Sequence, residues 1–235
     1  MENNFHKEIE GELKKHAGHG TTHSDNPNYH GSSHFSYHTS NPVKRKIAKE
    51  FLRKHKNLSQ KEFVDLLNAL YKARSHDEKH VAGMLLGYAK PYRKNILPKA
   101  TNEWLTHLEG WAEIDSLCQS NFTADEMLSS WKEWKQLLVS FSKSKNISKR
   151  RASLVLLTGL VTKSDDAKLT RLAFQNIEQL KNEENILITK AISWLLRSLT
   201  VKHKKEVTVY LRQNEVSLPR VAVWETKRKL LTGRK

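Results

Sequence analysis

Trp111 and Asp115 stand four positions apart in the segment Trp-Ala-Glu-Ile-Asp. In a helix, this spacing places an indole ring and a carboxylate on one face. Together they attract a cation, the ring through its quadrupole and the carboxylate through its charge. The pair alone is weak evidence for a site, because the same spacing is common in capped and core arrangements. Its chemistry therefore has to be judged together with other residues.

Trp194 is the second aromatic residue whose position suggests chemistry. At about 100° per residue, it points roughly 130° away from the centre of the apolar stripe of its own helix. Lys190 and Arg197 are its neighbours on that side. An aromatic ring between two cations either packs against the next pair of helices or contacts nucleic acid. The stripe consists of Ile188, Ile192, Leu195 and Leu199.

The charge balance narrows the choice of partner. The 235 residues contain 41 Lys and Arg against 25 Asp and Glu, a formal net charge of +16 at pH 7. This excess favours a polyanion, either nucleic acid or an anionic membrane surface. Basic residues gather in residues 43–56, 143–151 and 200–235, whereas residues 100–131 hold six acidic residues and no Lys or Arg. That acidic window, which contains Trp111, is either a solvated helix face or part of a site.

Membrane and disulfide-based classes are excluded by the composition. The longest apolar run, Leu154 to Leu157, is far shorter than the roughly 20 residues of a spanning helix. Residues 1–13 lack the apolar segment of a secretory signal. One cysteine, Cys118, cannot form an intramolecular disulfide or a cysteine-based zinc site and suits a reducing compartment. We therefore expect a cytoplasmic protein without a membrane partner.

The elements that must position these residues are predicted to be helices almost throughout. Apolar residues recur at helical spacing, and capping boxes begin at Ser59, Ser75 and Thr123. Asn41 before Pro42 is the expected N-cap of another helix. Only 207–211 resembles a strand, within a helical neighbourhood. Helices are expected near 3–15, 42–56, 60–74, 76–90, 100–109, 111–119, 123–141, 147–163, 166–180, 184–200, 203–213 and 218–230.

Many helices of this length with short linkers predict an all-α fold. We expect an α-solenoid of stacked antiparallel HEAT-like helix pairs with a concave basic face. Residues 42–235 would form the repeat domain, and residues 1–41 an N-terminal helix and a histidine-rich polar loop, within a single domain overall.

The histidine-rich segment, residues 16–41, has two interpretations. It carries six histidines, and His30, His34 and His38 recur at every fourth position, as metal ligands on a helix would. Glycine and serine around them predict a loop, however, where that spacing does not align side chains. No HExxH motif accompanies them. We expect a connecting or DNA-facing polar loop rather than a metal site.

Four segments resemble the AlkD-type DNA alkylation repair glycosylases, which are HEAT-like solenoids. The segment Asn41-Pro-Val-Lys-Arg-Lys-Ile-Ala-Lys resembles the family's Pro-x-x-Arg start of its second helix. Trp111-Ala-Glu-Ile-Asp resembles its Trp-Asp-x-x-Asp motif, and Arg151-Ala-Ser-Leu its Arg-Ala-Ala segment. The most specific match is Lys190-Ala-Ile-Ser-Trp-Leu-Leu-Arg, which resembles Lys-Ala-Ile-Gly-Trp-x-Leu-Arg. Order and spacing agree from about residue 42 to 215.

The resemblance implies a monofunctional DNA glycosylase that excises cationic N3- or N7-alkylated purines from duplex DNA. Trp111 and Trp194 would line the deoxyribose of the lesion, and Asp115 would be the catalytic carboxylate. Arg151 and Arg197 would contact phosphates. The family pattern implies no metal and no organic cofactor, and a monomer that associates with the nucleoid while it acts on DNA.

Further DNA-binding candidates are the basic and polar residues beside these segments. Two departures from the family pattern are Gly110, where a second Trp often stands, and Ala112, which replaces the first Asp. A non-catalytic HEAT-like protein that binds branched or damaged DNA is the alternative, and a protein scaffold is disfavoured by the charge. The further candidates are Lys149, Arg150, Lys190, Lys44, Arg45, Ser40 and Asn41.

Overall fold

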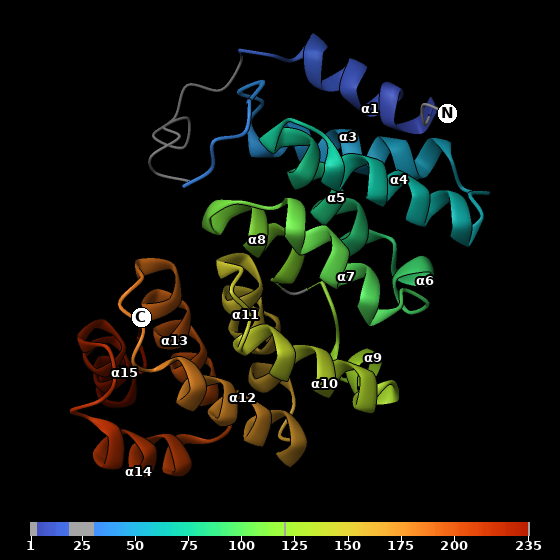
Figure 1. The fold of residues 1–235 in the computed structure, drawn as a ribbon. Coiled ribbons are helices and arrows are strands. Elements are labelled where there is room, and N and C mark those ends of the chain that lie inside the picture. Colours follow the sequence, from blue (N-terminus) through green and yellow to red (C-terminus); the bar gives the residue numbers. More distant parts are fainter. Residues whose placement is uncertain (1–3, 19–30, 120, 235) are drawn as a thin grey trace. The chain divides into compact units, whose positions relative to one another are not determined.

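The computed structural model describes residues 4–18, 31–119 and 121–234 (Figure 1). These residues form helices joined by short loops and include no strand, only an isolated bridge between Phe35 and Ser75. The predicted all-α class is confirmed. The chain divides into two compact units, Met1–Asn121 and Phe122–Lys235. The expected boundary after residue 41 falls inside the first unit.

The first unit is built around a row of packed helices. In chain order its helices are α1 (Asn4–Lys15), α3 (Asn41–Lys54), α4 (Gln60–Lys72), α5 (His76–Tyr88), α6 (Lys90–Arg93), α7 (Pro98–Trp104) and α8 (Gly110–Cys118), with a 3₁₀ turn at Leu105–His107. α5 packs against α3 on one side and α8 on the other, while α4 covers α5 and α7 packs on α4. We call α3, α5 and α8 the first row.

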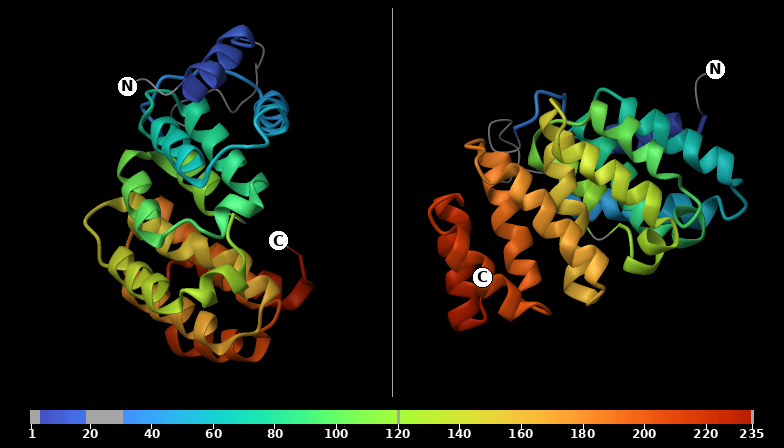
Figure 2. Two further views of the ribbon diagram at one scale, coloured as in Figure 1. Left: turned by 90° about the vertical axis from the view of Figure 1, so that its right-hand side faces the viewer. Right: turned by 60° about the horizontal axis from the view of Figure 1, so that its bottom comes forward.

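The second unit repeats this arrangement. Its helices are α9 (Ala124–Ser129), α10 (Trp131–Ser142), α11 (Ile147–Lys163), α12 (Ala167–Leu180), α13 (Ile186–Leu199), α14 (Lys204–Asn214) and α15 (Arg220–Thr232). α13 packs between α11 and α15 (Figure 2). α12 packs on α11 and α13, and α14 packs on α13 and α15. We call α11, α13 and α15 the second row. Contacts between every second helix are typical of stacked helix pairs, as the solenoid prediction requires.

Local sequence signals explain where most helices begin. All three predicted capping boxes are present, at Ser59 with Glu62, Ser75 with Glu78 and Thr123 with Glu126. Each satisfies two backbone N–H groups that the first turn leaves without partners. The expected cap at Asn41 is wrong by one position. Ser40 is the N-cap, and Asn41 and Pro42 are the first helical residues.

Several boundaries differ from the prediction. The helix expected over 123–141 is interrupted at Ser130, whose φ of −121° and ψ of 43° are not helical. Adjacent serines favour such a break, because Ser129 Oγ donates to the carbonyl of Glu126 and competes with the helical ladder. The helix expected over 100–109 begins earlier, at Pro98, and ends in the 3₁₀ turn. The strand-like run at 207–211 is helical within α14.

Apolar side chains at the predicted spacing form the core. The stripe on α4 that was read from the sequence is buried in full, and α11 is buried over every residue from Arg151 to Thr158. Within the described part of the chain, no helix has the length and apolar character needed to cross a bilayer. The α4 stripe consists of Phe63, Leu66, Leu67, Leu70 and Tyr71.

Candidate active site

Trp111 and Asp115 lie on α8, in the first unit. α8 begins at Gly110, whose φ of +64° lies in the left-handed region that favours glycine. A tryptophan at this position would be strained, which accounts for one departure from the resembled motif. Trp111 is half-buried, and Asp115 is only 8% exposed. The helix therefore presents a half-buried indole and a nearly buried carboxylate one turn apart.

α8 sits unusually close to α5, and a glycine permits it. An added Cβ at Gly83 would overlap the backbone carbonyl of Ser116. Ile114 and Leu117 on the buried side of α8 are fully excluded from solvent. Since the helices are in direct backbone contact, the orientation of Trp111 and Asp115 is fixed by α5.

Between these two residues, Glu113 is buried completely and collects four donors. Its carboxylate accepts from Ser32 Oγ at 2.6 Å, His34 Nδ1 at 2.9 Å and His76 Nδ1 at 3.0 Å. The backbone N–H of Glu109 donates to its other oxygen at 2.9 Å. Burial raises the pKa of Glu113, but the hydrogen bonds from the histidines and Ser32 outweigh burial and hold that pKa well below its usual range.

A second buried carboxylate, Asp77 at the start of α5, holds the neighbouring part of the same segment. It forms an ion pair with Lys44 at 3.1 Å and accepts from the backbone N–H of Tyr37 at 2.7 Å and from Ser36 Oγ at 2.9 Å. Burial raises its pKa, yet the charge of Lys44 and these hydrogen bonds lower it overall. Lys44 is thus buried in an internal pair, unlike the exposed Arg45 beside it.

The segment 31–40 is therefore fastened to the first row by buried polar contacts. Ser33 adds a third contact, because its N–H and hydroxyl both donate to Glu109 at 2.9 Å and 2.7 Å. Neither Glu113 nor Asp77 was singled out from the sequence. The available signal was the acidic window itself, since acids without neighbouring bases in a basic chain need partners from elsewhere.

The histidine-rich stretch is only partly described. His19, His23 and His30 lie outside the described residues, and His34 binds Glu113. His38 is exposed. Among residues whose placement is described, no group of three or more histidine, cysteine or acidic side chains is arranged to hold a metal ion.

Trp194 lies on α13 in the second unit, outside the buried stripe as predicted. The four residues of that stripe are fully buried, whereas Lys190 is exposed and Trp194 and Arg197 are half-buried. Arg197 forms an ion pair with Glu225 of α15 at 3.3 Å. The open side of α13 therefore carries an aromatic ring and a cation, with a second cation already paired.

The basic cluster at the start of α11 is engaged internally. Arg151 is 5% exposed and donates to the backbone carbonyl of Leu187 at the start of α13. Arg150 forms an ion pair with Glu183 at 2.6 Å, whereas Lys149 is half-buried. At the start of α3, Ser40 is half-buried and Asn41 is exposed. Arg151 and Arg150 therefore bind partners within the protein, whereas Lys149 has a partly exposed side chain that could contact DNA.

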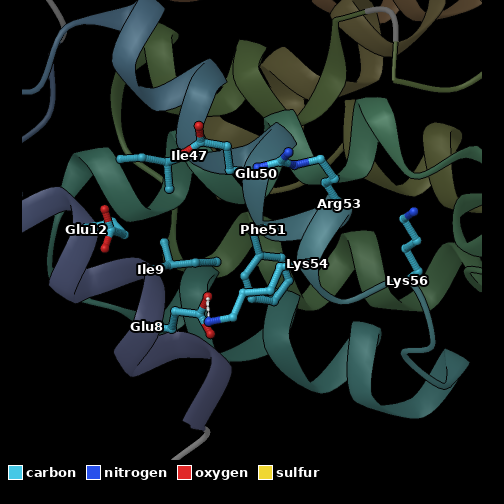
Figure 3. A pocket seen from close by; sticks show the side chains of 9 residues that line it. All are labelled: Glu8, Ile9, Glu12, Ile47, Glu50, Phe51, Arg53, Lys54 and Lys56. Atoms are coloured by element: carbon cyan, nitrogen blue, oxygen red, sulfur yellow. Dashed lines mark hydrogen bonds and ion pairs between the residues drawn. The ribbon is translucent and has the colours of Figure 1, made fainter.

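A groove of about 690 Å³ opens elsewhere in the first unit, between α1 and α3 (Figure 3). Charges of both signs line it, and Lys54 reaches Glu8 at 3.0 Å across it. Mixed charge with internal pairing offers little to a polyanion, so this groove is not part of the candidate site.

Comparison with known proteins decides the family. The family described as DNA alkylation repair enzyme matches residues 9–230. The chain belongs to this family. DNA is therefore the partner that membership implies. The predicted relationship is confirmed at this level.

A solved structure has the same fold as this family member. It is described as a predicted DNA alkylation repair enzyme from Enterococcus faecalis, with a TM-score of 0.71 and 17% sequence identity over 89% of this chain and 94% of that one. No curated protein matches the chain.

Proposed function

We propose that the protein is a monofunctional DNA glycosylase that excises cationic N3- or N7-alkylated purines from duplex DNA. The observation that carries the proposal is α8, where Asp115 is held nearly buried one turn from Trp111. Membership of an alkylation repair family supports the class of substrate.

The chemistry of the substrate matches these groups. A purine alkylated at N3 or N7 is positively charged, so its glycosidic bond is already weak and the base leaves with little acid assistance. Positive charge then develops on the deoxyribose, which resembles an oxocarbenium ion in the transition state. A fixed carboxylate and electron-rich ring faces stabilise that charge, because they need no reorganisation when it appears. Asp115 is the group we assign to this role, and it also orients the attacking water.

Each unit carries a tryptophan that we assign to the substrate. We propose that Trp111 of the first unit and Trp194 of the second contact the deoxyribose of the lesion. Lys190, Lys149 and Arg45 are the cations best placed to contact phosphates, since Lys44, Arg150 and Arg197 are in ion pairs within the protein. Arg151 contributes by fixing the start of α13.

Asp115→Asn tests the proposal. The change keeps the shape of the side chain and removes its charge, which matters far more in the transition state than in the ground state. We expect single-turnover release of a methylated purine to slow by about 10²–10³. Affinity for intact DNA, measured on the same preparation, should hold or rise slightly.

Two outcomes contradict the proposal. If Asp115 only stabilises α8, release changes by a few fold and the loss appears in the melting temperature instead. If the unaltered protein binds DNA but releases no methylated purine, the protein is a non-catalytic binder of damaged or branched DNA.

A further inference from the structure

We propose that the exposed face of α15 is a second DNA-binding surface, which contacts the sugar–phosphate backbone. The inference goes beyond excision and rests only on DNA being the partner. α15 is the last helix of the second row (dark red in Figures 1 and 2). Of its residues, only Glu225, the ion-pair partner of Arg197, was described with the candidate site.

The first observation is an exposed tryptophan. Trp224 is 61% exposed and is the most exposed of the six tryptophans. Its indole ring is therefore open to contact with a partner. Arg228 lies one turn on, with its guanidinium carbon 5.6 Å from the centre of the ring. The ring and the cation therefore hold one another in place on the helix surface.

The second observation is the charge of this face. At helical spacing, the outward side of α15 carries five exposed residues. Three are cations and none is an acid, so the face complements a polyanion. Leu231, which is 86% exposed, adds an apolar contact at the end of the face. The five are Arg220, Trp224, Lys227, Arg228 and Leu231.

The third observation is that two of these cations are available. Within the described part of the chain, neither Arg220 nor Arg228 forms an ion pair with a carboxylate, whereas Lys227 pairs with Glu215. Arg197 and Arg150 of the same unit are both paired. α15 therefore carries two guanidinium groups that are open to a phosphate, one on each side of Trp224.

The opposite side of α15 makes the face rigid. Ala222 and Thr226 are fully buried, and Glu225 accepts a hydrogen bond from Ser193 of α13 and pairs with Arg197. α13 carries Trp194, so this support links the new face to the candidate site within one unit. A rigid, prearranged surface loses little entropy on binding.

DNA fits the face better than a membrane does. An interfacial helix buries a broad apolar side in lipid, but the apolar side of α15 is occupied by α13. What remains outward is an Arg–Trp–Arg series one turn apart, which can neutralise successive phosphates while the ring packs on a sugar between them.

The test measures binding of the full chain to a short undamaged duplex over a range of salt concentrations. Arg220→Gln with Arg228→Gln should reduce the slope of log K against log salt by about two, because each phosphate contact contributes about 0.9. Trp224→Ala should weaken binding about fivefold, the lower end for aromatic contacts with nucleic acid, and leave the slope unchanged. Trp224→Phe should restore most of the loss.

Lys132→Gln with Lys135→Gln is the matched control, since it removes two exposed cations from α10 of the same unit. Equal losses in this control and in the α15 variants would overturn the proposal, as would unchanged affinity and slope in the α15 variants. Loss of binding only to phosphatidylglycerol-containing vesicles would assign the face to a membrane instead.

Failure of the proposed function gives a different result. An unaltered protein that releases no methylated purine refutes the glycosylase, while the salt slopes still decide the role of α15. In the α15 variants, single-turnover release at saturating protein should stay within twofold of the unaltered protein.

Discussion

α8 and α15 each carry a tryptophan beside charged residues, and they use them in opposite ways. On α8, Trp111 is half-buried, and Glu113 and Asp115 beside it are buried. On α15, Trp224 and its arginines face solvent. Burial of charge is expensive unless hydrogen bonds compensate it, so α8 is held by polar contacts that fix its geometry. α15 leaves Arg220 and Arg228 exposed to solvent.

This difference in burial suits the two helices to different functions, catalysis and binding of a polyanion. Stabilising a charge that develops in a reaction requires fixed groups, and this is the role that we propose for α8. Holding a long polyanion requires exposed cations whose binding weakens with salt, and this is the role that we propose for α15. We therefore expect changes on α8 to alter stability and rate, and changes on α15 to alter affinity and its dependence on salt.

Glu113→Ala should have the largest effect on stability. It leaves the buried donors Ser32 and His76, and the half-buried His34, without their acceptor. Breaking a buried, hydrogen-bonded charge network typically costs about 3–5 kcal/mol. Denaturant unfolding measures the loss, and the paired change Arg220→Gln with Arg228→Gln should stay within about 0.5 kcal/mol of the unaltered protein.

Glu113→Gln is the second variant, and it keeps the test open if the alanine variant does not accumulate as folded protein. Its amide can accept on one side only, so it should be intermediate in stability. Equal stability of Glu113→Gln and the unaltered protein would show that the charge of Glu113 does not hold the segment 31–40.

The next largest effect should be on the acid dependence of stability, which we expect variants on α8 to change and variants on α15 to leave unchanged. The folded-state pKa values of Glu113 and Asp77 are depressed, so both groups contribute stability above the ordinary carboxyl values of 4.5 and 3.8. As the pH falls below these ordinary values, the unfolded chain takes up protons that the folded chain does not. The free energy of unfolding therefore decreases until the pH reaches the lower pKa values of the folded chain. Glu113→Gln should show a shallower decrease. Parallel acid profiles for the two proteins would contradict the assignment, whereas the α15 variants should follow the unaltered protein.

The fold was largely readable from the sequence because its signals are local. The capping boxes at Ser59, Ser75 and Thr123 and the apolar stripe of α4 each depend on residues within a few positions. The break at Ser130 was missed, since neither glycine nor proline marks it and the competing hydrogen bond comes from an ordinary serine.

The buried network was not readable, because its partners are far apart in the chain. Glu113 meets His34 and His76, which precede it by 79 and 37 positions. The acidic window around Glu113 is a sequence signal, but it does not distinguish Glu113 from a solvated glutamate. Lys44 is likewise predicted from the sequence to bind DNA, whereas in the structure it pairs with Asp77. The catalytic and phosphate-contacting roles of the candidate residues stay predictions.

Chelation should have the smallest effect of all. His34 and His76 both point Nδ1 at Glu113, and a carboxylate accepts but cannot donate, so each Nδ1 carries a hydrogen and only Nε2 is left to bind a metal. Among the described residues, no group of three or more histidine, cysteine or acidic side chains is arranged to hold a metal ion. Both oxygens of Glu113 are also occupied, one by Ser32 and the histidines and the other by His34 and the Glu109 N–H. Exhaustive dialysis against a chelator should therefore leave the melting temperature and purine release unchanged, because a bound structural ion would contribute directly to folding. A fall in melting temperature that zinc reverses, and that Glu113→Gln abolishes, would instead make this cluster a metal site, and α8 would then be held by an ion rather than by hydrogen bonds.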